Sequence, residues 1–300
     1  YFDEELNINE LGFLSRNDQQ NLDYNYNVFE SGIEGLRSRS TTFVSVNQWN
    51  ADGRPVRFGI FASQDYNFLN NDTFSVSARV FPQRVDDRLG RGTGSFRVPT
   101  REALILNYKS DPTKSLALNF GIQWDTDDLG PAQINSSAGI TWRPTDRFSS
   151  QLNLAYTDQE ALLVYKENGA YTSFEAHQWA PNMEVNYFLG PRQQIRLTMQ
   201  YNGLKAYEDR FWQANSDSVE FLAPVEKPTN TSDSFVVSRM TFQARYRWEI
   251  APLSDLFLVY TRGSNLPRDS FDSYADLFAQ TWNQPIVDFF AFRLRYRLGS

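Results

Sequence analysis

Apolar and polar residues alternate along most of this chain, and the pattern is most regular near the C-terminus. The run 290–298 carries apolar side chains on one face and arginines on the other: Phe290, Phe292, Leu294, Tyr296 and Leu298 against Arg293, Arg295 and Arg297. Because successive side chains of a β-strand point to opposite faces, this run is a strand with one apolar and one polar surface. A strand that separates lipid from water has this pattern.

The same alternation predicts thirteen strands and no helix. The predicted strands cover residues 22–30, 36–50, 55–69, 72–85, 101–109, 114–125, 132–143, 147–165, 171–189, 194–211, 235–249, 254–264 and 286–298. Their connections alternate in length: short turns lie at 70–72, 111–114, 144–147, 190–193 and 251–254, and mostly longer polar loops lie at 86–100, 126–131, 212–234 and 265–285. Short turns at one rim and long loops at the other are typical of outer-membrane barrels, whose short turns face the periplasm.

Such a barrel has an even number of strands, so a further strand is predicted over Asn9–Ser15, paired with the last strand to close the barrel. The predicted fold is therefore an all-β, transmembrane, antiparallel outer-membrane β-barrel of about 14 strands. It is predicted as a single domain over residues 1–300, with both ends in the periplasm. The alternative is a soluble all-β sandwich or barrel, whose strands are seldom this long and rarely carry aromatic residues at both ends of an exposed face.

Aromatic residues lie near both ends of the predicted strands. Trp142 and Tyr187 are close to short turns, whereas Tyr156 and Tyr201 are nearer the long loops. Two aromatic girdles at the membrane interfaces would have this placement. The residues expected to contact lipid are Phe120, Trp124, Phe242, Trp248, Phe292 and Tyr296.

Composition excludes several other classes of protein. With 41% apolar residues and a mean hydropathy of −0.53, the chain is too polar for a helical membrane protein. A barrel strand needs an apolar residue only at every second position, so low hydropathy does not argue against it. Cysteine is absent, which removes disulfides, thiolate metal sites and cysteine nucleophiles. The net charge of −7 argues against a nucleic-acid partner.

The segment 7–18, NINELGFLSRND, resembles the start of the barrel in an uncharacterised family of Gram-negative outer-membrane proteins. In that family a carbohydrate-binding family-9-like module precedes a C-terminal barrel of unknown function. The resemblance implies a bacterial outer-membrane location and a longer precursor, in which an upstream module or plug precedes this chain. It carries over no catalytic residues. The segment is less similar to the start of TonB-dependent receptor barrels, and 300 residues are too few for a barrel of about 22 strands with extended loops.

If the apolar face meets lipid, the opposite face lines a lumen, and the late strands make one wall of this lumen basic. The residues of the predicted basic wall are Arg196, Arg239, Arg245, Arg247, Arg293, Arg295 and Arg297. Arginines arranged in this way favour anions or acidic sugars as solutes. In the alternative, they pair with carboxylates on facing strands, with a plug, or with Asp3, Glu4, Glu5 and Glu10 near the predicted closing strand.

Catalysis and metal binding have weaker support. Barrel hydrolases pair histidine with serine or aspartate, and the strand parity of the one histidine, His177, directs it at lipid unless a bulge at Pro181 changes the register. The carboxylates of Asp125, Asp127 and Asp128 could hold calcium, but such clusters are more often solvated. We expect no catalytic residues, no metal and no cofactor.

The leading hypothesis is an outer-membrane pore or transport component for small polar or anionic solutes, with oligosaccharides as one class. The rival is a closed barrel that anchors the upstream module or docks a partner protein, and an outer-membrane hydrolase is a third, weaker alternative. Outer-membrane lipid is an expected partner under the first two hypotheses, and nucleic acid under none.

Overall fold

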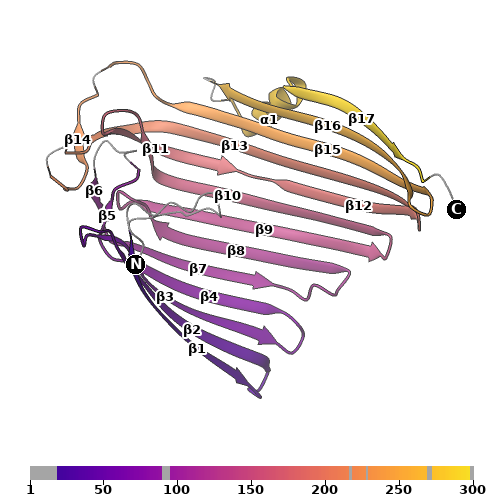
Figure 1. The fold of residues 1–300 in the computed structure, drawn as a ribbon, viewed down its shortest axis with the longest axis horizontal. Helices are drawn as coiled ribbons and strands as arrows, with labels where there is room; N and C mark the ends of the chain where they lie inside the picture. The colour runs from indigo at the N-terminus through magenta and orange to yellow at the C-terminus, as the bar shows by residue number, and fades with distance from the viewer. Residues whose placement is uncertain (1–18, 90–94, 216–217, 228, 269–271, 298–300) are drawn as a thin grey trace.

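The computed structural model describes residues 19–89, 95–215, 218–227, 229–268 and 272–297. Its main feature is one large antiparallel sheet, which runs from β1 at one edge to β17 at the other (Figure 1). The all-β antiparallel class predicted from the alternation is confirmed. No helix in these ranges is long and apolar enough to cross a membrane.

The strands of the main sheet pair mostly in chain order, so the sheet is a meander. They are β1 (Gln20–Ser31), β2 (Leu36–Trp49), β3 (Pro55–Phe68), β4 (Thr73–Phe81), β7 (Arg101–Lys109), β8 (Leu116–Thr126), β9 (Ala132–Thr145), β10 (Phe148–Tyr165), β11 (Ala170–Trp179), β12 (Asn182–Gly190), β13 (Gln193–Gln213), β15 (Phe235–Ala251), β16 (Ser254–Arg268) and β17 (Val287–Arg295). The short turns lie at the right-hand end of the sheet in Figure 1, and the longer connections of the middle strands lie at the left.

Strands β11 and β12 are the two halves of one predicted strand, interrupted at Pro181. Both halves pair with β10 on one side and with β13 on the other. Trp179 lies opposite Tyr156, and Asn182 lies opposite Asn153. The two pairs are three positions apart on both strands, so the register is unchanged. Proline removes one backbone donor here, but it does not turn the following side chains to the other face.

The two edges of the sheet bear on the predicted closure. In the described ranges no hydrogen-bonded pairing joins β1 to β17. The predicted closing strand, Asn9–Ser15, lies outside these ranges. Closure into a barrel of about 14 strands therefore stays a prediction, with its physical reason that an open edge in hydrocarbon leaves backbone groups unpaired.

Two short strands, β6 (Phe96–Val98) and β14 (Ala223–Val225), and one helix lie where loops were expected. Strand β6 pairs with β5 (Arg84–Asp86) as a small hairpin, and β14 pairs with the end of β13. The expectation of no helix is wrong, because α1 (Tyr274–Asn283) forms between β16 and β17. Ser273 caps this helix by accepting a hydrogen bond from the Asp276 N–H at 3.2 Å. Serine followed three residues later by an acidic residue is a capping-box type of sequence signal that the alternation analysis did not use.

Tight packing is concentrated where β10, β11 and β13 approach the longer loops. One buried cluster joins Phe96 and Val98 of the β5–β6 hairpin to Tyr171. A second joins Phe174, Ala176 and Ala206. Away from these clusters the sheet has two clearly different faces.

Candidate functional site: the two faces of the sheet

The apolar face can be followed across the sheet through the strand register. One row of facing residues runs Leu118, Ile140, Leu152, Met183, Met199 and Phe242 from β8 to β15. Many apolar side chains on this face are exposed, among them Phe120, Ile122, Ile140, Leu152 and Leu154. Soluble monomers rarely expose contiguous apolar patches larger than a few hundred Å². An apolar face that continues over successive strands therefore points to a non-aqueous surrounding.

Aromatic side chains border this face at two levels. At the short-turn end, the ring of Phe148 lies 5.5 Å from that of Trp142 and 6.2 Å from that of Tyr187. At the opposite end, the rings of Tyr156 and Trp179 lie 4.9 Å apart. Eight residue steps separate the two levels along β10, which is about 27 Å of strand before tilt. This height suits the apolar band of about 25 Å in membrane barrels.

Five of the six residues predicted to contact lipid are exposed and have the apolar-face parity. Their exposed fractions are 49% for Phe120, 39% for Trp124, 37% for Trp248, 63% for Phe292 and 58% for Tyr296. The sixth, Phe242, has protein around it: its ring lies 5.5 Å from that of Trp282 in α1 and 6.2 Å from that of Tyr260. Lipid contact at all six positions stays a prediction.

Helix α1 covers part of the apolar face of β13 and β15. Leu277 and Thr281 of the helix are fully buried against Ser238 of β15, whose hydroxyl lies 3.3 Å from the Leu277 carbonyl and hydrogen-bonds the Thr281 hydroxyl. Phe278 packs edge-on against Tyr201 at 5.2 Å. The helix thus supplies hydrogen-bond partners to the Ser238 hydroxyl, which lies on a mostly apolar face.

A charged pair also lies on the apolar face, and sequence alternation missed it. Arg262 stands opposite Phe242 in the apolar row, and Asp288 stands opposite Arg262. Their side chains pair at 2.8 Å, and the Arg262 guanidinium also donates to the Trp282 carbonyl at the C-terminal end of α1. An arginine there would be costly without these partners.

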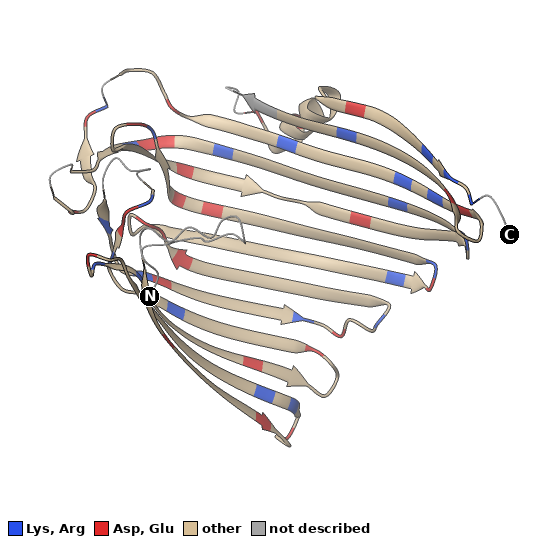
Figure 2. Ribbon diagram, in the orientation of Figure 1, with Lys and Arg blue, Asp and Glu red and all other residues tan. Residues whose placement is uncertain are grey.

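The opposite face is polar and contains the predicted basic wall. One row of facing residues runs Asn119, Gly139, Asn153, Asn182, Gln200 and Thr241. Arg196, Arg239, Arg245 and Arg247 lie on this face of β13 and β15, and Arg293 and Arg295 lie on it in β17, with Arg297 just beyond the strand. Figure 2 shows these cations spread along the late strands.

The wall combines paired and unpaired arginines. Arg196 pairs with Glu184 at 2.9 Å, and Arg247 pairs with Asp255 at 2.9 Å. Arg239 donates to the Asn265 side chain at 3.2 Å. In the described part of the chain, no ion pair is formed by Arg245, Arg293 or Arg295. The predicted pairing with Asp3, Glu4, Glu5 and Glu10 falls outside the described residues.

A second group of arginines lies on the polar face of the early strands, where the sequence analysis named none. Arg57, Arg79, Arg84 and Arg101 line a cavity of about 590 Å³ together with Asp125. The alternation of Val76, Ala78 and Val80 with Ser77 and Arg79 contains the signal that could have found this group.

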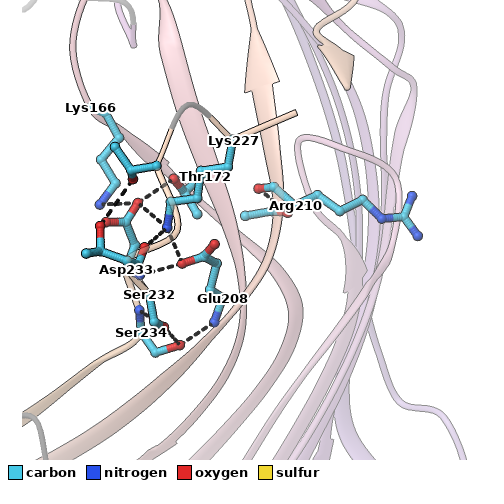
Figure 3. Close-up of polar contacts among 11 residues, drawn as sticks. Lys166, Thr172, Glu208, Arg210, Lys227, Ser232, Asp233 and Ser234 are labelled. Carbon is cyan, nitrogen blue, oxygen red and sulfur yellow. Dashed lines mark hydrogen bonds and ion pairs between the residues drawn. The ribbon is translucent and has the colours of Figure 1, made fainter. Parts of the chain in front are cut away.

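An ion-paired network fixes the loop before β15 to the tops of β10 and β13 (Figure 3). The Lys227 ammonium lies 2.6 Å from Glu208 and 3.4 Å from Asp233, and Asp233 also lies 3.3 Å from Lys166. Burial opposes the charged form of Lys227, but the hydrogen bond to Glu208 and the charge of Asp233 outweigh it and raise the pKa of Lys227. The loop is therefore held to the rim by charge and hydrogen bonds.

His177 lies in an Asp–His pair, one of the two pairings named above for barrel hydrolases. His177 pairs with Asp158 at 3.0 Å and contacts the Tyr156 hydroxyl at 3.4 Å. It therefore lies on the apolar face at the aromatic level farther from the short turns. No serine hydroxyl is recorded within hydrogen-bonding distance of its ring among the described residues. Asp128 pairs with Arg101 at 2.8 Å rather than joining Asp125 and Asp127. The described residues contain no group of three or more His, Cys, Asp or Glu side chains placed to hold a metal ion.

Comparison with known proteins places the chain in a family. No curated protein sequence matches it. A solved structure titled "NanC porin structure in rhombohedral crystal form" shares 8% identity, covers 81% of this chain and 86% of its own, and has a TM-score of 0.26. That score is too low to support an argument about fold or function. One family matches residues 1–299, and its description is "Domain of unknown function (DUF5916)". The chain belongs to the DUF5916 family.

Proposed function

We propose that this chain is a bacterial outer-membrane β-barrel that forms a pore or transport component for small polar or anionic solutes, oligosaccharides among them. The observation that carries the proposal is the division of one sheet into an exposed apolar face and a polar face with arginines. Outer-membrane lipid is the proposed partner of the first face, and water and solute are the proposed partners of the second. The proposed role involves no catalysis.

Ion conductance of the purified protein in a planar lipid bilayer tests this proposal. We expect stepwise openings with a preference for anions, because Arg245, Arg293 and Arg295 form no ion pair in the described part of the chain. The preference should weaken at high salt, since the Debye length falls from about 10 Å at 0.1 M to about 3 Å at 1 M.

Replacement of these three arginines by glutamine should move the reversal potential toward that of a non-selective pore, because glutamine keeps hydrogen-bonding capacity and loses the charge. A reversal potential unchanged by the triple substitution would contradict the role of the wall.

A second candidate function is a closed barrel that anchors an upstream carbohydrate-binding-like module or docks a partner protein. Two observations favour it: Arg196 and Arg247 are neutralised by carboxylates, and Lys227 ties a loop to the rim. A folded, membrane-inserted protein without any conductance would support this candidate over the pore.

A further inference from the structure

The cavity on the early strands has a composition that differs from the rest of the polar face. It lies near the longer loops, where β4 and β8 end and β3 and β7 begin, beside the β5–β6 hairpin. Its volume of about 590 Å³ falls in the range of small-molecule sites. Its walls are mostly charged or amide side chains, so a hydrophilic solute fits it better than an apolar one.

Two of the arginines in the cavity already have carboxylate partners. Arg84 pairs with Asp86 at 3.1 Å and with Asp128 at 3.4 Å. Arg101 pairs with Asp128 at 2.8 Å and lies 3.7 Å from Asp125. These pairs hold the hairpin and the loop after β8 in place. They therefore fix the shape of the cavity, and the charges of Arg84 and Arg101 are largely neutralised.

Arg57 and Arg79 supply further positive charge. Neither forms an ion pair within the ranges that the structure describes. Arg79 is half-buried, and its guanidinium lies 6.0 Å from the centre of the Phe61 ring, an orientation that suits a weak cation–π contact. The charge of Arg79 also acts on Asp125. Five arginines and three carboxylates line the cavity, so its net charge is positive and favours an anion.

The strand register explains why there is a hollow beside Arg79. Arg79 of β4 lies opposite Ala103 of β7, and Ala103 lies opposite Asp125 of β8. The small methyl group of Ala103 therefore leaves space between the side chains of Arg79 and Asp125. The amides of Gln48 and Gln123 also line this space, and each can both donate and accept a hydrogen bond.

We propose that this cavity binds a small anion that carries hydroxyl groups, such as a carboxylated monosaccharide. Arg79 and Arg57 hold the anionic group, and Gln48 and Gln123 hydrogen-bond the hydroxyls. The inference deepens the proposed function, because it assigns a solute class and a place on the polar face to a barrel that passes polar or anionic solutes.

Isothermal titration of the folded, full chain in detergent micelles tests the site without requiring conductance. The probe is glucuronate, with glucose as the neutral match and inorganic phosphate as an anion without a hydroxylated ring. We expect glucuronate to bind more tightly than either. Arg79→Gln should weaken glucuronate binding at least about tenfold, because a charge-assisted hydrogen bond becomes a neutral one.

Arg147→Gln is the matched control, because it removes the same charge from the exposed short-turn rim and should leave glucuronate affinity unchanged. Arg57→Gln is the second variant if Arg79→Gln fails to give the circular dichroism spectrum of the folded barrel. Equal affinity for glucuronate in wild type and in both cavity variants would overturn the site, and phosphate binding as tight as glucuronate would overturn the hydroxylated class. Glucuronate binding without conductance would contradict the proposed pore and support the binding site. Conductance together with glucuronate binding that neither cavity variant weakens would contradict the binding site and support the pore.

Discussion

Leu152 offers the sharpest test of which face of the sheet meets lipid. It lies in β10 midway between the aromatic levels of Phe148 and Tyr156, and 36% of it is exposed. In a soluble protein, Leu152→Arg at such a surface position would change the free energy of unfolding by about 0.5 kcal/mol or less. Near the middle of a bilayer the same change costs about 2 to 4 kcal/mol. The two surroundings therefore predict clearly different results.

The adjacent residue provides a control on the same strand. Gln151 is exposed on the polar face, opposite Glu184 of β12, so Gln151→Arg should cost little in either case. Reversible urea unfolding in lipid vesicles, followed by tryptophan fluorescence, measures both variants. If Leu152→Arg is no more destabilising than Gln151→Arg, the apolar face is not in contact with lipid. Phe242 is a poorer probe for this purpose, because Trp282 already covers part of its ring.

Three further predictions use the same unfolding measurement. Arg262→Gln should cost about 1 to 3 kcal/mol by leaving Asp288 without its cation, and Asp288→Asn in that background should restore part of the loss; no recovery would mean that the pair is not coupled. Gly59→Ala should cost about 1 to 3 kcal/mol, since its Cβ would come within 2.9 Å of a phenylalanine ring, whereas Gly190→Ala meets nothing within 4 Å and should be neutral. Burial raises the pKa of Asp127 from 3.8 to about 6, so the stability that Asp127 contributes should be lost as pH rises through that window. Asp127→Asn should remove this contribution from the pH profile of the unfolding free energy, and an unchanged profile would contradict it.

The strands could be predicted from the sequence because the alternation repeats so often. A strand with one lipid face and one water face must alternate, and the run from Leu118 to Asp125 does so without a break. The register at Pro181 could not be predicted in this way, since a bulge and an uninterrupted pairing give the same local sequence. The pairs Tyr156 with Trp179 and Asn153 with Asn182 in the structure show that it is unchanged.

Helix α1 and the cavity show two further limits of the pattern. Parity assigns Ser238 and Phe242 to the apolar face correctly, but it cannot reveal that residues some 40 positions later fold back to cover them. Parity also assigns Arg79 to the polar face, but whether Arg79 is free or paired depends on strands and loops distant in sequence. Alternation thus predicts the face of a side chain and leaves its neighbours undetermined.

The charged pair on the apolar face gives α1 a physical role beyond covering one patch of the sheet. Without the helix, Arg262 would keep Asp288 but lose the Trp282 carbonyl that accepts from its guanidinium. Ser238 would lose its partner Thr281 at the same time and would keep the Tyr201 hydroxyl at 3.2 Å. Both losses would remove hydrogen-bond partners from polar groups on the face proposed to meet lipid, where an unsatisfied hydrogen-bonding group costs several kcal/mol. The helix and the polar residues beneath it therefore stabilise each other, and β17 begins beside Gly263, at the level where this helix ends.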